Sequence, residues 1–116
     1  MYRYQDLRVR TKKFALDIIH FYRQLPRNAE AYIIGKQLLR SGTSVAANYR
    51  AAQRARSRAE FIAKLGIVVE EADETQFWLE LMQESQLVRN DTLQDLQHEI
   101  GELVAMFTAS LKTAKS

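Results

Sequence analysis

Large apolar residues recur at intervals of three and four through four stretches of the chain, and this spacing is what most constrains its fold. Residues so spaced lie on one face of an α-helix, so each stretch predicts an amphipathic helix. The predicted helices cover residues 6–24, 28–55, 58–87 and 91–112, each to within a few residues. One proline and four glycines are too few for an all-β fold, which needs many turns.

The apolar faces of these helices define an expected core. Because the connections between the helices are short, neighbouring helices should be antiparallel. The sequence therefore predicts one all-α domain over residues 1–116, an up-down-up-down antiparallel four-helix bundle. The expected core-facing residues are Leu7, Phe14, Ile18, Phe21 and Leu25; Ala31, Ile34, Leu38, Ser41, Val45, Asn48 and Ala52; Phe61, Leu65, Val68, Ala72, Thr75, Leu79 and Met82; and Leu93, Leu96, Ile100, Leu103 and Phe107.

Helix ends are marked by residues that break or cap helices. Pro26 ends the first helix, because the residue before a proline is pushed out of the helical region. Ser57 and Glu60 have the spacing of a capping box at the start of the third helix. Further expected caps are Asn28 and either Asn90 or Asp91, and the chain after Lys112 is expected to fray.

The segment Ser41-Gly-Thr-Ser44 permits two interpretations. A continuous helix is favoured, because the apolar face keeps its register on both sides, and small residues would let a neighbouring helix approach closely. The alternative is a break at Gly42, since glycine costs about 1 kcal/mol relative to alanine inside a helix. Ser41 and Asn48 are polar residues on the apolar face, and each is expected to bond to a neighbouring helix and fix its register.

Charge is divided unequally along the chain. Residues 1–58 carry 13 basic and 3 acidic side chains, a balance of +10, and residues 59–116 carry 4 and 11, a balance of −7. Such asymmetry indicates a polyanionic partner or self-association. Arginine clusters bind phosphates through charge-assisted, bidentate bonds. The predicted nucleic-acid-binding residues are Arg8, Arg10, Lys12, Lys13, Lys36, Arg40, Arg50, Arg54, Arg56 and Arg58. The alternative is a solvated face with ordinary salt bridges to the third helix.

Several large apolar residues lie off the predicted core-facing stripes. A bundle needs one apolar stripe per helix, so surplus residues predict an oligomer interface. The residues concerned are Val9, Leu16, Ile19, Ile67 and Trp78, with Trp78 as the candidate hot spot. The alternative is that wide stripes merely cover the edges of the bundle.

The sequence gives little support to an enzyme. It has no cysteine, no nucleophile elbow and no phosphate-binding loop. The best catalytic candidates, Asp17-x-x-His20 and Asp95-x-x-His98, resemble metal-binding pairs of ferritin-like bundles. The periodicity places these histidines on outer faces, so we expect no catalytic residue, metal or cofactor. With no signal peptide or membrane span in the sequence, a cytoplasmic location is expected.

Three ordered motifs carry a family resemblance over essentially the whole chain. They are Ser41-Gly-Thr-Ser-Val-Ala-Ala-Asn-Tyr-Arg50, Ser57-Arg-Ala-Glu-Phe-Ile-Ala-Lys-Leu65 and Glu71-Ala-Asp-Glu-Thr-Gln-Phe-Trp-Leu79. Together they resemble the bacterial four-helix-bundle proteins also called 23S rRNA intervening-sequence proteins. A related branch is the accessory variability determinant of diversity-generating retroelements, which works beside a reverse transcriptase and its template RNA.

The resemblance implies a homopentameric ring of bundles with no known catalysis, and nucleic-acid binding in the retroelement branch. This chain departs from the family pattern at Ala51, where a glutamate is common, and at Glu70, where a lysine is common. Both departures steepen the charge asymmetry. The leading hypothesis is an accessory subunit of a ribonucleoprotein, with RNA or DNA, further copies of itself and a reverse transcriptase as partners. The alternative is a structural or protein-interaction oligomer.

Overall fold

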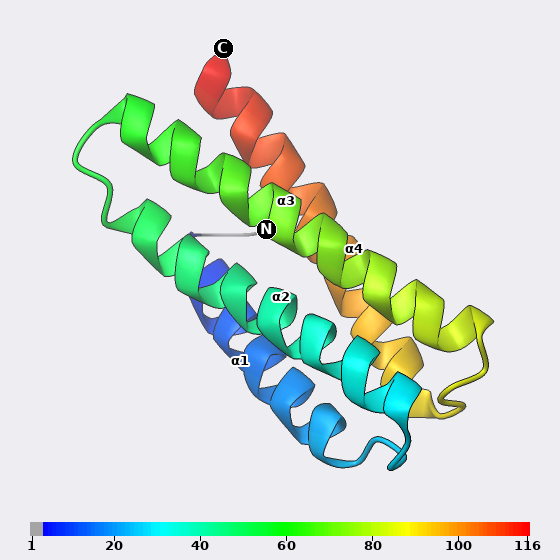
Figure 1. Cartoon of the computed structure of the whole chain (residues 1–116). Helices are drawn as coiled ribbons and strands as arrows, with labels where there is room; N and C mark the ends of the chain where they lie inside the picture. The colour runs from blue at the N-terminus through cyan, green and yellow to red at the C-terminus, as the bar shows by residue number, and fades with distance from the viewer. Residues whose placement is uncertain (1–3) are drawn as a thin grey trace.

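Four α-helices make up the computed structural model, which describes residues 4–116, with side chains from Leu7 onward. They are α1 (Tyr4–Arg23), α2 (Ala29–Gln53), α3 (Arg58–Glu84) and α4 (Asp91–Lys115). Each helix packs against the next along the chain, α4 also contacts α1, and the loops join them at alternate ends of the bundle (Figure 1). The predicted all-α class and the four helices are therefore confirmed. None of the described helices is long and apolar enough to cross a bilayer.

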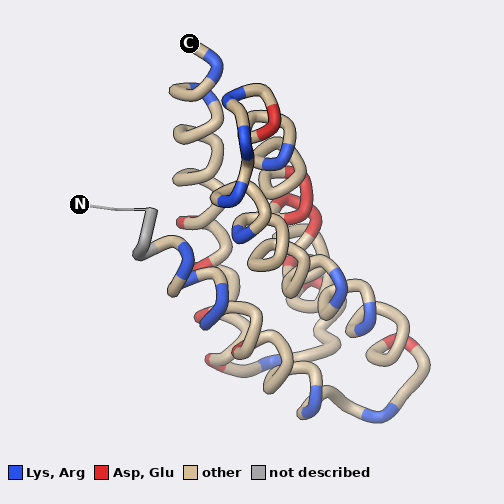
Figure 2. Tube along the Cα trace, turned by 90° about the vertical axis from the view of Figure 1, so that its left-hand side faces the viewer, with Lys and Arg blue, Asp and Glu red and all other residues tan. Residues whose placement is uncertain are grey.

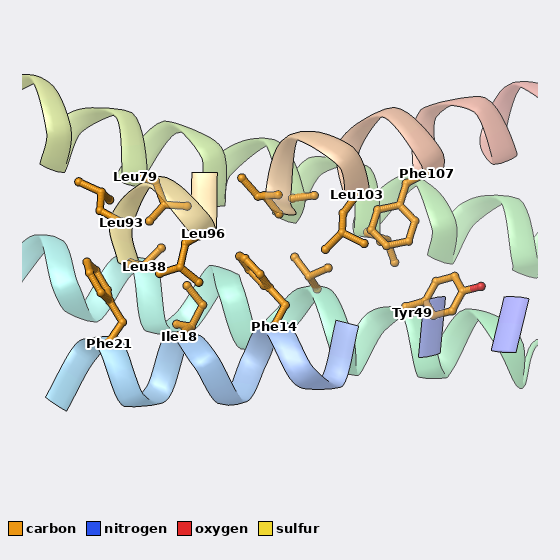
Figure 3. Packing of buried hydrophobic residues seen from close by; sticks show 14 of the residues in the cluster. Phe14, Ile18, Phe21, Leu38, Tyr49, Leu79, Leu93, Leu96, Leu103 and Phe107 are labelled. Atoms are coloured by element: carbon orange, nitrogen blue, oxygen red, sulfur yellow. The ribbon is translucent and has the colours of Figure 1, made fainter. Parts of the chain in front are cut away.

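The core consists mainly of the residues that the periodicity placed inside. Phe14 and Ile18 of α1 point toward Leu38 of α2 and Leu96 of α4 in the centre of the bundle (Figure 3). Burial of each such side chain stabilises the folded state by about 1.5–3 kcal/mol. The buried residues that were not predicted include Val88 as well as Thr11 and Tyr49, which are each 1% exposed, and the Tyr49 ring packs 5.4 Å from that of Phe107.

The helix α2 is continuous, so the alternative of a break at Gly42 is wrong. A Cβ at Gly42 would lie 3.0 Å from Cγ1 of Ile18 in α1, and one at Gly35 would lie 2.6 Å from Cδ1 of Leu25. Both distances are shorter than ordinary van der Waals contact. The glycines are therefore kept within the helix despite their propensity cost, because Gly42 lets α1 approach α2 closely and Gly35 makes room for Leu25 of the loop that follows α1.

Of the two polar residues predicted to bond to a neighbouring helix, one does so. The hydroxyl oxygens of Ser41 and Thr75 lie 2.9 Å apart and join α2 to α3 inside the core. Asn48 was predicted wrongly: its amide Nδ2 donates to the carbonyl oxygen (2.9 Å) and hydroxyl (2.7 Å) of Ser44 in its own helix. Asn48 lies at the edge of the apolar face, and the next residue, Tyr49, takes the inward position.

All three helix starts in the described chain after α1 carry the side-chain cap that the sequence predicts. The side chains of Asn28, Ser57 and Asn90 accept bonds from backbone N–H groups three residues on, at 2.8, 3.1 and 2.9 Å. Asn90, rather than Asp91, is therefore the cap of α4. The capping box is formed on one side only, since the Glu60 carboxylate lies 3.7 Å from Nε of Arg56.

Two helix ends differ from the prediction. The α3 helix ends at Glu84 rather than near residue 87, because Gln86 adopts a left-handed φ of 62° and the Leu87 N–H donates to the carbonyl of Met82 at 3.1 Å. The α4 helix does not fray after Lys112 but continues to Lys115. Arg58 stabilises this last turn by donating to the carbonyl oxygen of Ala114 at 2.9 and 2.5 Å.

Candidate nucleic-acid interface

Basic residues follow one another along α1 and α2 and around the end of the bundle where α2 ends and α3 begins (Figure 2). The acidic residues lie mostly on the helices behind them. Because α1 packs against α2, the charge asymmetry along the sequence becomes an asymmetry between helix pairs. A basic side chain is free to bind a ligand only where no acidic group of the chain already holds it.

Arg10 is held by acids of α4. Its guanidinium binds Glu99 through two nitrogens, at 2.9 and 2.5 Å, and Glu102 through Nη2 at 2.8 Å. The hydrogen bond from Arg10 is the main cause that lowers the pKa of Glu102. Arg10 therefore joins α1 to α4 and is not free to bind phosphate.

Arg40 is held by acids of α3. Its guanidinium pairs with Glu71 at 3.0 Å and also with Glu74. The indole N–H of Trp78 donates to the same Glu74 carboxylate at 3.0 Å. The bond from Trp78 and then that from Arg40 hold the pKa of Glu74 below its usual value. For Arg40, the alternative of an ordinary salt bridge to the third helix is the correct one.

Acidification should break this cluster. Because the pKa of Glu74 is lowered in the folded chain, its contribution to stability is present above the unfolded pKa of about 4.3 and is lost as pH falls through the folded value. Trp78 is the one tryptophan, so its fluorescence reports on the cluster. We expect constant emission from neutral pH down to about 5 and a change below about 4.3. The Glu74→Gln variant should lack this step; a full step in that variant would contradict the assignment.

Four more predicted cations have partners within the chain. Lys13 pairs with Asp17 at 2.8 Å along α1. Arg56 lies 3.7 Å from Glu60, and the Nζ of Lys36 lies 5.0 Å from the centre of the Tyr32 ring. The fourth is Arg58, which holds the end of α4 through backbone carbonyls. The Arg56 side chain is 90% exposed and lies beyond hydrogen-bond distance of Glu60, so it remains available to a ligand.

The remaining predicted cations are exposed and have no ion pair among the side chains from Leu7 to Ser116: they are Arg8, Lys12, Arg50 and Arg54. Arg8 and Lys12 from α1 and Arg50 from α2 line a groove between these two helices, with a volume of about 520 Å³. Its other lining residues are Val9, Thr11, Ala46, Ala47 and Tyr49.

A shallower hollow of about 410 Å³ continues this groove, because both are lined by Ala47 and Arg50. It adds Arg54, Arg56 and Lys64, together with one acid, Glu60, which is the partner of Arg56. Lys64 was not predicted as a binding residue. The sequence feature that could have identified it is its position one helical turn after Glu60 at the start of α3, close to the arginine cluster. We call the continuous cationic surface the basic track: Arg8, Lys12, Arg50, Arg54, Arg56 and Lys64.

The predicted oligomer-interface residues are exposed only in part. Val9, Leu16 and Ile67 are 69%, 48% and 43% exposed, whereas Ile19 is half-buried. Trp78 does not face away from the core as expected, but packs against it, with its ring edge-to-face against Phe77. The periodicity assigned Trp78 to the outer face because Trp78 lies at the edge of the wide apolar face of α3. Exposed apolar residues that were not predicted are Tyr32, Ile33 and Phe77.

The catalytic candidates lie at the surface. Asp17, His20 and Asp95 line a second groove, between α1 and α4, of about 620 Å³, and His98 Nε2 pairs with Glu102 at 2.9 Å. In the described part of the chain no three such side chains gather closely enough to hold a metal ion. The structure therefore supplies no metal-ligand set from these motifs.

Comparison with known proteins gives a family and a structural relative. Residues 5–109 match the family of the 23S rRNA-intervening sequence protein. A crystal structure from Bacteroides thetaiotaomicron, of a protein of unknown function in the S23 ribosomal protein family, is 33% identical with a TM-score of 0.86. The match covers 94% of this chain and 97% of that one. No curated protein matches the chain.

Proposed function

This chain belongs to the 23S rRNA-intervening sequence protein family, and on that premise we propose that it binds the phosphate backbone of RNA or DNA through the basic track. The observation that carries the proposal is a continuous hollow lined by six basic residues, five of which have no ion pair among the described side chains. Phosphates supply the acceptors that unpaired guanidinium and ammonium groups lack.

The proposed assembly is a homopentameric ring whose subunits are up-down-up-down bundles. Exposed apolar residues stand on α1, as Leu16, and on α3, as Ile67. The first helix belongs to the basic half of the chain and the third to the acidic half. A head-to-tail contact of α1 of one copy with α3 of the next would bury both residues and oppose unlike charges. A two-fold contact of either face with itself would oppose like charges.

The proposed role is that of a non-catalytic accessory subunit of a ribonucleoprotein, such as a reverse-transcriptase complex of a diversity-generating retroelement. The family's name points to an RNA context, and the basic track supplies the means of contact. The alternative is an oligomer with a structural or protein-interaction role. It is favoured by the internal pairing of Arg10, Arg40 and Arg58, which removes these cations from the proposed site.

A salt titration of RNA affinity tests the proposal. If each of the six cations of the basic track neutralises one phosphate, the logarithm of the affinity should fall with the logarithm of salt concentration with a slope of about −4 per chain. Fluorescence anisotropy of a labelled oligonucleotide measures it. Absence of binding at low salt, with the assembly intact by light scattering, would favour the protein-interaction role.

A further inference from the structure

We propose that the groove between α1 and α2 holds an unpaired base, so that the protein prefers single-stranded nucleic acid to duplex. The inference rests on the proposed nucleic-acid binding and adds the class of ligand. It is drawn from the shape of the groove, its charge, and its difference from the groove between α1 and α4.

The floor of the groove suits the face of a base. Ala46 and Ala47 have side chains no longer than a methyl group, and Val9 adds an exposed apolar wall. Beneath them, Tyr49 is 1% exposed and packs against Phe107, so the floor is part of the rigid core. The volume of about 520 Å³ lies within the range of small-molecule pockets. A planar base can bury an apolar face here without displacing a large side chain.

The cations stand on both sides of this floor. Arg8 and Lys12 project from α1 and Arg50 from α2, and none of the side chains from Leu7 onward that line the groove is acidic. The phosphates that flank a seated base would therefore meet a cation on either side. From Arg50 the basic track continues to Arg54 and Lys64, where the next phosphates of the strand would lie.

The groove between α1 and α4 shows what is specific about this arrangement. It is larger, about 620 Å³, and also has an apolar floor, which includes Phe14 and Leu96. Its walls, however, carry Asp17, Asp95 and Glu99. Glu99 and Asp17 pair with Arg10 and Lys13, the two Lys and Arg side chains that line this groove, so these cations are not free to bind phosphate. Asp95 adds a negative charge, which repels phosphate, so the apolar floor alone does not make a nucleotide site.

The α1–α2 groove combines an apolar floor with walls free of acids among the described residues, and it continues into the basic track. A hollow of about 540 Å³ beside the loop from α1 to α2, lined by Arg23 and Arg27, also lacks acids among the described residues, but it shares no residue with the basic track.

The bases of a duplex cannot pack on the apolar floor of the groove. Their faces are stacked and their edges are paired, and extruding one base costs a few kcal/mol. A duplex would therefore contact the cations at the rim and leave the apolar floor empty, whereas a single strand gains both contacts. The preference for single strands follows from this difference.

The test is the Ala47→Leu variant, which fills the floor without changing charge. Leucine is a good helix former, so α2 should be retained. Affinity is measured by anisotropy for a uridine oligonucleotide and for a blunt duplex of equal length. We expect the single-strand affinity to fall about tenfold or more, as the loss of a buried base face implies. Duplex affinity and the salt slope should not change. Ala105→Leu, at an exposed alanine of α4, is the matched control and should alter neither affinity.

Three results would overturn the inference, and they separate it from the proposed function. Equal affinity of the parent protein for both oligonucleotides, or an equal loss for both in Ala47→Leu, would leave backbone binding in place without a base site. A change of assembly mass in Ala47→Leu would make the groove a contact between copies. Failure of the parent to bind either oligonucleotide would remove the proposed function and this inference with it.

Discussion

Replacement of Arg8, Arg50 and Arg54 by alanine is expected to lower affinity for single-stranded RNA by about 100-fold or more, since each charge-assisted contact contributes about 1.5–3 kcal/mol before any compensation. These residues are exposed and have no ion pair among the described side chains, so their removal breaks no salt bridge within the bundle. The salt slope should also become shallower by about 2, because three phosphate contacts are lost at about 0.7 each.

The matched control removes the same charge from the other end of the bundle. Arg23, Arg27 and Arg89 are exposed and lie near the loops that join α1 to α2 and α3 to α4 (Figure 1). Their triple alanine variant should keep most of the affinity and show a smaller change in salt slope. If both triple variants lost affinity equally, the interaction would depend on net charge and the basic track would not be the site.

Introduction of glutamate at Leu16 or at Ile67 is expected to dissociate the assembly into monomers. Both side chains are exposed, at 48% and 43%, so neither substitution opens a cavity in the core. A charge placed in an apolar contact loses its hydration without gaining a partner, at a cost of several kcal/mol per interface. Leu16 is chosen over Val9 because Val9 also lines the α1–α2 groove. The measurement is mass by light scattering or sedimentation.

A mixture of the two variants tests the head-to-tail contact itself. The Leu16→Glu chain keeps its α3 face and the Ile67→Glu chain keeps its α1 face, so the mixture can form one intact contact. We expect a one-to-one dimer and no ring, while each variant alone stays monomeric. If Leu16→Glu were monomeric and Ile67→Glu still assembled, the contact would not join α1 to α3. If both variants kept the parent mass, neither residue would lie in the interface.

The fold could be predicted because its signals are local. The spacing of Phe14, Ile18 and Phe21 defines the buried face of α1 without knowledge of what that face meets. The caps at Asn28 and Ser57 act on backbone groups three residues away, so the sequence alone locates them. The wrong predictions of burial concern residues at the edges of the apolar helix faces. There, a shift of one residue along the helix changes a buried position into an exposed one. Asn48 and Tyr49 are the clearest example.

The candidate site could be predicted only in part, because long-range pairing decides which cations are free. Arg10 and Arg50 are indistinguishable in the sequence as arginines of basic, amphipathic helices. Arg10 meets Glu99, which is 89 residues away along the chain, whereas Arg50 forms no ion pair among the described side chains. Nothing local distinguishes the two arginines. Lys64 stands close to the arginine cluster in the sequence, but it joins the basic track only because α3 packs against α2.

The sequence by itself determined the helices, most of the core and the division of charge, because each depends on the order of residues within a few turns. Only the tertiary structure decided which charges are neutralised and where grooves remain. The packing of α1 against α2 leaves a cationic groove over Ala46 and Ala47, and the packing of α1 against α4 leaves one bordered by acids. The physical reason is that ion pairs and grooves form between helices, so they depend on the distances between residues remote in sequence.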